Sequence, residues 1–350
     1  MAQSRRGCGC AVVGALALVA VFAAVAWMLF GTQLREWWQR PAPPPASGKE
    51  LQVRVLDVGQ ADSILIQAPS GKTVLVDAGE PGDGKRILEA LKKYGAAQID
   101  LLVATHAHAD HIGAADEVIK GATVGRVLYS GVPNTTKNYQ DFLKAIDEKK
   151  LELIKAAPGQ TFDLGDGVVL TVLAPSEPLF TKDELRSGGN EPNANSVVMR
   201  LDYGDFSMLL TGDAEAQTEE RLMRQGANVA ADVLKVGHHG SKYATSENFV
   251  KRGQFKAALV SAGLDNRYGH PSQDALDRLR AAGVKLYRTD FQGEITLTSR
   301  GSDDFKITTA KEAKPEQDVW AGREALRDDS ARRGFIDFGD LPPAPTPKPE

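Results

Sequence analysis

Between residues 50 and 300 the chain is a succession of short apolar runs separated by polar turns. Alternating apolar and polar residues, as in 51–58, are typical of a strand with one buried face. Apolar residues three and four apart, as in 85–94, are typical of a helix packed on a core. For the first half the pattern predicts strands at 51–58, 62–67, 73–77, 101–104, 125–129, 151–155 and 168–173, and helices at 85–94, from 111 to about 120, and at 139–149.

The second half changes to a regular alternation of strands and helices. It predicts strands at 196–203, 206–211, 231–236, 257–261, 284–288 and 294–298, and helices at 216–224, 246–252 and 272–282. The polar loop that precedes them, 175–192, is long enough to form a flap facing a substrate. Two strand-rich halves with helices between them predict an α/β domain in which two packed sheets are covered by helices.

The first fifty residues carry a different pattern. About twenty apolar residues without a charge, 11–30, match the length needed to cross a bilayer as a helix. A signal peptide cleaved after Ala24-Val25-Ala26 is the alternative, but the apolar run continues past that point. We therefore expect a single-pass membrane protein with its folded domain outside the cytoplasm, or a secreted domain if cleavage occurs.

The predicted organisation follows from these segments and from the proline-rich and charged stretches at either end. It comprises a short tail at 1–10, a transmembrane anchor at 11–30, a proline-rich linker at 31–49, a folded domain at 50–308 and a disordered tail at 309–350.

Charge and cysteine content limit the kinds of site. The formal net charge of −4 argues against a broad basic surface that holds nucleic acid by charge alone. It does not exclude a nuclease, because bound metal ions supply local positive charge. The two cysteines, Cys8 and Cys10, precede the apolar segment, so the folded domain has neither a disulfide nor a thiolate ligand.

Residues 99–113 hold the strongest chemical signal. A buried apolar run ends there in three imidazoles and a carboxylate, His106, His108, Asp110 and His111. Without partners at the end of a buried strand, such groups would lose their solvation. Imidazole and carboxylate are the usual nitrogen and oxygen ligands of zinc and similar ions. Alternate residues of an extended stretch point the same way, so His106, His108 and Asp110 are predicted to converge on a metal.

Two further segments carry histidines. His238 and His239 directly follow the apolar run that begins at Leu234. Because neighbours on a strand point in opposite directions, we expect His238 to be a ligand and His239 to support it or donate a proton, their order staying open. Lys235 either faces a substrate phosphate or lies at the strand edge. His270 completes a metal site, protonates a leaving group or belongs to a helix-capping loop.

The H-x-H-x-D-H segment resembles the metal motif of the metallo-β-lactamase superfamily. The resemblance implies a four-layer αββα sandwich and a bridging position between two metals for Asp213, for which a helix N-cap is the alternative. Asp57, Gln60 and Asp77 resemble superfamily positions that line the metal site. We expect them to orient the ligands, although polar bends explain the same residues.

Six motifs in a fixed order narrow the resemblance. They are D-V-G-Q-A-D-S, the histidine motif, N-x-N-S-V-V, L-L-T-G-D, L-K-V-G-H-H-G-S and Y-G-H-P-S. Across residues 51–300 they resemble the metallo-hydrolase domain of ComEC-type DNA-uptake competence proteins. This chain has His108 where that family commonly has an aspartate. It has Asn195, expected beside the ligands, near the place where many superfamily members have another histidine ligand.

The resulting hypothesis is a hydrolase with two divalent ions, zinc or manganese. One ion is assigned to His106, His108 and a histidine of the 238–239 pair, the other to Asp110, His111 and His270, with Asp213 between them. The residues expected to act in catalysis are Asp110, His239 and Lys235.

The ComEC resemblance implies a phosphodiesterase or nuclease that acts on DNA or another nucleic acid. Two alternatives stay open. One is hydrolysis of a small ester, lactone or lactam on the same metals, and the other is a DNA-binding module without catalysis.

Overall fold

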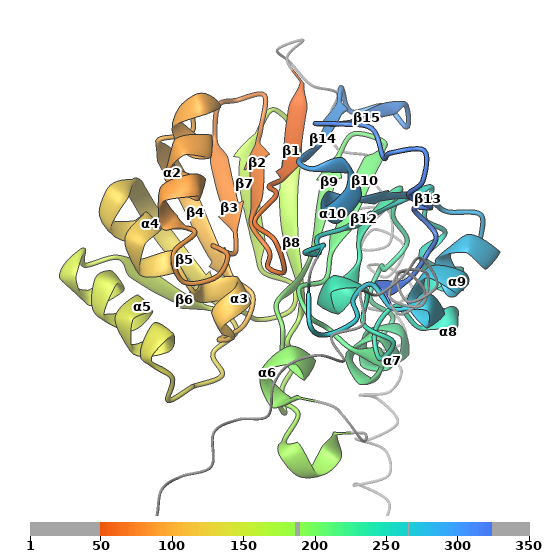
Figure 1. The fold of residues 1–350 in the computed structure, drawn as a ribbon. Coiled ribbons are helices and arrows are strands. Elements are labelled where there is room, and N and C mark those ends of the chain that lie inside the picture. The colour runs from red at the N-terminus through yellow and green to blue at the C-terminus, as the bar shows by residue number, and fades with distance from the viewer. Residues whose placement is uncertain (1–49, 186–189, 265, 324–350) are drawn as a thin grey trace, which may run out of the picture. The chain divides into compact units, whose positions relative to one another are not determined.

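The computed structural model describes residues 50–185, 190–264 and 266–323, which belong to one compact unit (Figure 1). The predicted N-terminal tail, membrane anchor and linker at 1–49 lie outside the described residues. Within the described ranges, no helix combines the length and the apolar character that crossing a membrane requires.

The first sheet joins the beginning of the folded domain to its end. Its strands in the described residues are β1 (Leu51–Val55), β2 (Ile64–Gln67), β3 (Thr73–Val76), β4 (Gln98–Ala104), β5 (Thr123–Tyr129), β6 (Glu152–Lys155), β14 (Ile295–Ser299) and β15 (Phe305–Thr309). Their order is β15-β14-β1-β2-β3-β4-β5-β6. β3 to β6 run parallel, so their carboxyl ends lie at one edge of the sheet.

The second sheet is built from the middle of the chain. Its strands in the described residues are β7 (Thr161–Gly165), β8 (Val168–Ala174), β9 (Val198–Tyr203), β10 (Phe206–Leu210), β11 (Val233–Lys235), β12 (Ala257–Val260) and β13 (Lys285–Arg288). They follow the order β13-β12-β11-β10-β9-β8-β7. β10 to β13 run parallel, and β7 to β10 pair antiparallel.

Helices cover the outer face of each sheet. The described helices are α2 (Gly84–Lys93), α3 (Ala109–Ile112), α4 (Ala115–Gly121), α5 (Lys137–Glu148), α6 (Glu191–Ala194), α7 (Ala216–Arg224), α8 (Glu247–Gly253), α9 (Gln273–Ala281) and α10 (Thr289–Gln292), with 3₁₀ turns η1 (Lys182–Glu184) and η2 (Gly237–Gly240). Figure 1 shows α2, α4 and α5 beside the first sheet and α7, α8 and α9 beside the second.

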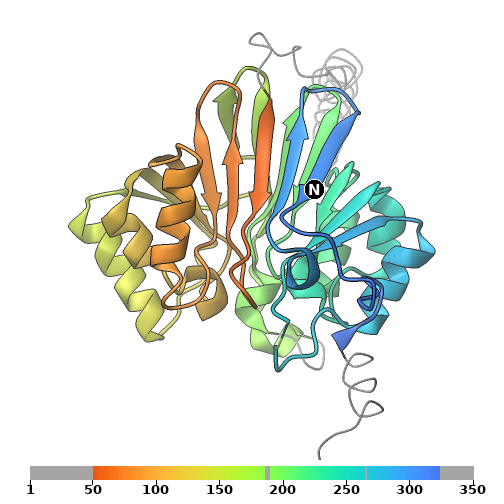
Figure 2. The same cartoon turned by 45° about the horizontal axis from the view of Figure 1, so that its top comes forward.

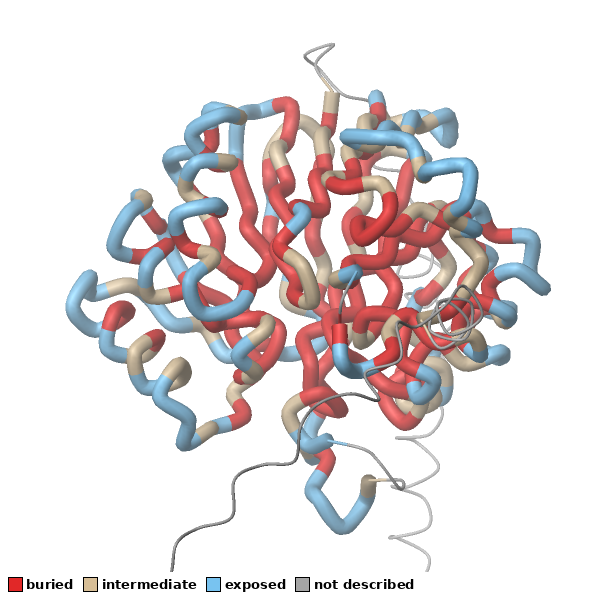
Figure 3. The backbone as a smooth tube through the Cα atoms, viewed as in Figure 1, coloured by how far each residue is buried: buried red, intermediate tan, exposed pale blue. Residues whose placement is uncertain are grey.

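Three apolar cores separate the four layers. One lies between the two sheets and takes alternate residues of their strands, such as Val168, Leu170 and Val172 of β8. The other two lie between each sheet and its own helices. The two sheets face each other in Figure 2, and in Figure 3 the strands are largely buried while the helices expose one side. The predicted αββα sandwich is confirmed, because burial of these apolar faces requires that arrangement of layers.

Most predicted elements are present, with ends shifted by a few residues. The sequence pattern missed β7, β15 and α10. In β15 intermediate and exposed residues alternate, so this edge strand has no fully buried face for the pattern to reveal. The helix predicted from 111 to about 120 is divided into α3 and α4. It is interrupted because the His111 carbonyl accepts a hydrogen bond from the Ala78 backbone N–H at 2.7 Å instead of continuing a helix.

Two predicted boundaries also change. The expected polar loop at 175–192 contains η1 and α6 in its described residues. The folded domain continues beyond 308, because Gln273 Nε2 donates to the Trp320 carbonyl at 3.0 Å and Gly322 N–H donates to Gln273 Oε1 at 2.8 Å. The prediction of a disordered tail from residue 309 is therefore wrong for 309–323, and 324–350 lie outside the described residues.

Candidate metal centre

The predicted ligands lie at the carboxyl ends of parallel strands from both sheets. His106 to His111 follow β4 in the first sheet. Asp213 follows β10 in the second sheet, and His238 and His239 follow the adjacent strand β11. Strand direction therefore brings residues more than a hundred positions apart in the chain to one place, as in other open α/β sheets.

One group of possible ligands consists of His106, His108 and Asp213. Their ligand atoms all lie within 4.8 Å of one another. His106 Nε2 is 2.9 Å from His108 Nδ1 and 3.8 Å from Asp213 Oδ2. His106 and Asp213 are buried, whereas His108 lines an open cavity. Two imidazoles and a carboxylate at this spacing fit a divalent cation.

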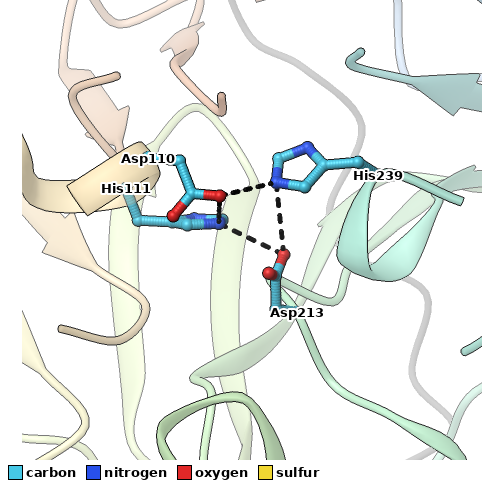
Figure 4. Close-up of side chains that lie close together, drawn as sticks. All are labelled: Asp110, His111, Asp213 and His239. Carbon is cyan, nitrogen blue, oxygen red and sulfur yellow. Dashed lines mark ion pairs between the residues drawn. The ribbon is translucent and has the colours of Figure 1, made fainter. Parts of the chain in front are cut away.

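A second group consists of Asp110, His111, Asp213 and His239 (Figure 4). His111 Nε2 lies 3.2 Å from Asp213 Oδ1, and His239 Nε2 lies 3.4 Å from Asp110 Oδ2. The distance from His239 Nε2 to Asp213 Oδ1 is 3.8 Å. One oxygen of Asp213 faces each group, so this carboxylate belongs to both of them.

Several buried polar atoms at the centre make no hydrogen bond, as is expected of atoms that bind a cation. In the described residues His111 Nε2, His239 Nε2 and Asp213 Oδ1 are buried and accept or donate no hydrogen bond. Such unpaired atoms cost free energy unless something binds them. Because the three atoms converge from three separate segments, the residues present fit a bound cation.

Electrostatics at the second group favour the charged form of His111. Burial alone lowers the pKa of His111, but Asp213, Asp77 and Asp110 together raise this pKa well above its ordinary value. Burial raises the pKa of Asp213, and His111, His238 and His239 outweigh it, so the pKa lies well below its usual range. A divalent cation among these carboxylates supplies positive charge, as a protonated imidazole does.

His111 is oriented by groups on its other ring nitrogen. Its Nδ1 lies 2.8 Å from Asp77 Oδ2. Asp77 in turn accepts hydrogen bonds from the Thr105 backbone N–H and hydroxyl, both at 2.8 Å. The Asp77 carboxylate thus occupies the place expected for a group that fixes a ligand histidine and leaves Nε2 free for a metal.

His238 and His239 are arranged differently from the prediction. The strand ends at Lys235, and both histidines have left-handed backbone conformations, with φ of 48° and 52°. The alternation of a strand therefore does not apply to them. His239 reaches Asp110 and Asp213, and its Nδ1 donates to the Ser261 carbonyl at 3.0 Å if it carries the proton.

His238 lies beside this ligand group rather than in it. Its Nε2 is 3.7 Å from Asp213 Oδ2, and its Nδ1 is 3.3 Å from the buried carboxylate of Glu215. The geometry therefore assigns the ligand position at the second group to His239, the reverse of the expected order.

Lys235 does not face a substrate. Its side chain is 1 % exposed, and Nζ donates to Asp62 Oδ2 at 2.9 Å and to the Val236 carbonyl at 3.0 Å. The expected contact of Lys235 with a substrate phosphate is wrong, because the ammonium is buried and paired. Asp62, which the prediction passed over, holds this lysine and belongs to a buried cluster with Asp77 and His111.

The remaining predicted residues lie around the centre in different ways. His270 lines the cavity with its ring centroid 5.3 Å from that of His238, outside both ligand groups. Gln60 also lines the cavity and accepts from the Gly263 backbone N–H at 3.0 Å. Burial first, then His238 and His239, lower the pKa of His270 to about 3, so its imidazole is neutral at physiological pH. In this form His270 does not carry the extra proton that the expected protonation of a leaving group needs.

Asp57 and Asn195 do not reach the ligands. Asp57 is exposed, and its backbone carbonyl accepts a hydrogen bond from Arg86 at 3.0 Å. Asn195 bonds to the backbone N–H and carbonyl of Phe180, each at 2.9 Å, and so holds the segment before α6. The expectation that these two residues orient metal ligands is wrong, because the Asn195 side chain bonds to Phe180 and the exposed Asp57 carboxylate makes no bond to a ligand in the described residues.

Two residues that the prediction passed over lie nearer. Ser196 Oγ is 3.4 Å from His106 Nδ1 and accepts a hydrogen bond from the Asp213 backbone N–H at 3.2 Å. The Asn193 amide lies 3.3 Å from His238 Nε2. Both belong to the N-x-N-S-V-V motif, so the motif marked the right segment although the wrong asparagine was chosen.

Four residues of the ligand groups, His108, Asp110, Asp213 and His239, line an open cavity of about 480 Å³. This volume lies within the range of about 300–1,000 Å³ that is typical of small-molecule sites. The lining is His108, Asp110, Asp213, His238, His239 and His270, together with Gln60, Ala107, Ala109, Thr136, Asn190, Asn193 and Tyr268. The site is thus accessible, has several neutral hydrogen-bonding groups and suits a water-dependent reaction on a bound ligand.

Comparisons with known proteins agree with this geometry. The family model described as "Metallo-beta-lactamase superfamily" matches residues 56–263. ComE operon protein 3 of Bacillus subtilis is 34 % identical over 269 residues, covering 72 % of this chain and 33 % of that protein. Competence protein ComA of Neisseria gonorrhoeae is 30 % identical over 292 residues, covering 80 % and 38 %.

A third relative is Recombination protein 2 of Haemophilus influenzae, 30 % identical over 251 residues, covering 70 % of this chain and 28 % of that protein. The chain spans about a third of the length of these curated relatives. The αββα sandwich, the ligand groups at its strand ends and the matched family model lead to one conclusion: the chain belongs to the metallo-beta-lactamase superfamily.

Proposed function

We propose that this chain is a metal-dependent phosphodiesterase that hydrolyses DNA strands. The observation that carries the proposal is the pair of ligand groups that share Asp213 at an open cavity. The similarity to competence proteins over 70–80 % of the chain supports nucleic acid as the substrate class.

Two divalent ions, zinc or manganese, are the proposed cofactors. His106, His108 and Asp213 would hold one, and Asp110, His111, Asp213 and His239 would hold the other. Two such ions supply an activated water and stabilise the charge that develops on both the attacking and the leaving oxygen of a phosphodiester.

The protein groups around the ligands have separate tasks in this proposal. Asp77 and the Ser261 carbonyl fix the rings of His111 and His239, so that each presents Nε2 to the centre. The neutral amides of Gln60 and Asn193 line the cavity and orient the substrate by hydrogen bonds. The neutral imidazole of His270 lines the cavity and offers the substrate a hydrogen bond rather than a proton.

We also propose that residues 11–30 anchor the protein in the cell membrane, with the hydrolase domain outside the cytoplasm. The apolar length and the absence of charge in this segment support an anchor.

The test is hydrolysis of single-stranded DNA by the purified full-length chain, first depleted of metal and then supplied with Zn²⁺ or Mn²⁺. We expect metal-dependent cleavage that falls at least about 100-fold in Asp213→Ala, because loss of a group that merely orients a ligand already costs about 10–100-fold. Asp303→Ala removes an exposed carboxylate away from the ligand groups and serves as the control.

Cleavage that is unchanged in Asp213→Ala would contradict the proposal. Hydrolysis of lactones or cephalosporins without hydrolysis of DNA would instead support the small-ester or lactam alternative. Binding of DNA without bound metal or turnover would support the non-catalytic alternative.

A further inference from the structure

We propose that Tyr268, together with Arg267, forms a platform on which a nucleobase next to the reacting phosphodiester stacks. The proposal rests on the proposed function and specifies how the same cavity recognises a nucleotide strand.

An exposed aromatic side chain lies at the metal centre. Four large apolar side chains are exposed in the described residues, Leu153, Tyr243, Leu264 and Tyr268. Three of the four lie in the loops that follow η2 and β12, the segments that contribute His239 and His270. Tyr268 is the most exposed of them at 54 %, and it lines the metal cavity. An apolar ring kept in water at this position is available to a ligand.

The loop that carries Tyr268 is held in place. The side-chain oxygen of Asn266 accepts hydrogen bonds from the backbone N–H groups of Tyr268 and His270, at 3.1 and 3.0 Å. Its amide nitrogen donates to the Gly263 carbonyl at 2.7 Å. The Tyr268 ring is thus presented from a hydrogen-bonded turn over residues 266–270, so stacking on it does not require this turn to form first.

The surroundings of the ring suit a nucleotide. Tyr268 is stacked beside His270, with ring centroids 5.9 Å apart and an interplanar angle of 26°, so a base would add the next layer. The Arg267 guanidinium lies 5.0 Å from the Tyr268 centroid and donates to its hydroxyl at 3.0 Å. Aromatic rings paired with cations bind single-stranded nucleic acid by stacking on bases while the cation faces the phosphates.

The described part of the cavity lining offers no permanently cationic side chain to the phosphates of a nucleic-acid strand. In the described residues its lining contains no lysine or arginine, while Asp110 and Asp213 contribute carboxylates. The ions would therefore hold the reacting phosphate, and affinity for the rest of the strand must come from the rim. Arg267 and Tyr268 supply a cation and an aromatic face there.

The experiment combines a change in the protein with a change in the substrate. The full-length metal-loaded protein is assayed on dithymidine monophosphate and on two analogues that each lack one thymine. Stacking on an aromatic side chain contributes a factor of about 5 to 150 per base. For the wild type, we expect kcat/KM to be lower by a factor in this range for one analogue than for the intact dinucleotide. For Tyr268→Ala, we expect kcat/KM on the intact dinucleotide to fall by the same factor relative to the wild type. On that analogue, the variant and the wild type are expected to have equal kcat/KM.

Two variants serve as controls. Tyr268→Phe keeps the ring and is expected to retain the preference for the intact dinucleotide. Tyr243→Ala removes an exposed tyrosine that also carries a nearby cation, Lys242, but does not line the cavity, so its preference is expected to equal that of the wild type.

The result that overturns the inference is a wild type that cleaves all three substrates equally, or Tyr268→Ala that keeps the full preference for the base. Loss of the preference in Tyr268→Phe would also overturn it, because the hydroxyl rather than the ring would be responsible. If the wild type cleaves no phosphodiester, the proposed function fails, and binding of oligothymidylate with and without abasic positions to the same variants then decides on stacking alone.

Discussion

At the scale of residues, two neighbouring histidines with the same chemistry have different surroundings. His239 is buried and faces Asp110 and Asp213, with its other nitrogen against a backbone carbonyl. His238 is partly exposed and faces Glu215 and the cavity. Both residues have a left-handed backbone, so the alternation of a strand does not decide which way either side chain points.

We predict that the two histidines differ in metal binding. His239→Ala is expected to lower the metal content of the purified protein from about two ions per chain to about one. The reason is that this change removes a ligand of the second group. His238→Ala is expected to keep both ions. Elemental analysis of the two variants, with circular dichroism to verify folding, gives the answer, and equal metal loss in both would contradict the assignment.

At the scale of elements, a buried ion pair connects strand β11 of the second sheet to the segment between β1 and β2 of the first sheet. Lys235 and Asp62 are both 1 % exposed, and 173 positions separate them in sequence. Removing one partner of a buried pair leaves the other charge unpaired in the interior, which costs about 3–5 kcal/mol. The pair therefore fixes the turn after β1 against the strand that leads to His238 and His239.

We predict that Lys235→Met lowers the free energy of unfolding by about 3–5 kcal/mol, measured by urea denaturation. Lys251→Met serves as the matched control, because Lys251 pairs with Glu247 on the exposed surface of α8, with both side chains 68 % exposed. That change is expected to cost less than about 0.5 kcal/mol. A cost for Lys235→Met as small as that of the control would show that the buried pair does not stabilise the fold.

At the scale of the whole described domain, the metal centre joins the two sheets. Both ligand groups combine residues that follow β4 in the first sheet with Asp213, which follows β10 in the second. Ions bound to these groups would therefore link the two sheets. A ligand that binds only the folded state raises stability by mass action, by about 2.7 kcal/mol at one hundred times its dissociation constant.

We predict that a chelator lowers the midpoint of thermal unfolding by about 5–10 °C, which is the shift that such a stabilisation gives in a domain of this size. Asp213→Ala, which lacks the shared ligand, is expected to show no such shift with the chelator. Differential scanning calorimetry measures both proteins. An equal shift in the variant would indicate that the stabilising ions bind elsewhere.

The sequence by itself determined the layers and the kinds of ligand. Strand and helix periods are local properties, so the apolar alternation of β8 and the helical spacing of α7 could be predicted from neighbours alone. The same holds for the histidines and carboxylates at strand ends, since their chemistry and position need no distant contact. Edge strands such as β15 were missed, because little of their surface is buried and their pairing depends on a partner elsewhere in the chain.

Only the tertiary structure decided which of these residues work together. Lys235 and Asp62 form an ion pair although 173 positions separate them in sequence, and the residues next to each give no sign of its partner. The order of His238 and His239 depends on a backbone conformation that a periodic pattern does not encode. Asp213 belongs to both ligand groups because two sheets bring two strand ends together, a contact that exists only after the core between them has formed.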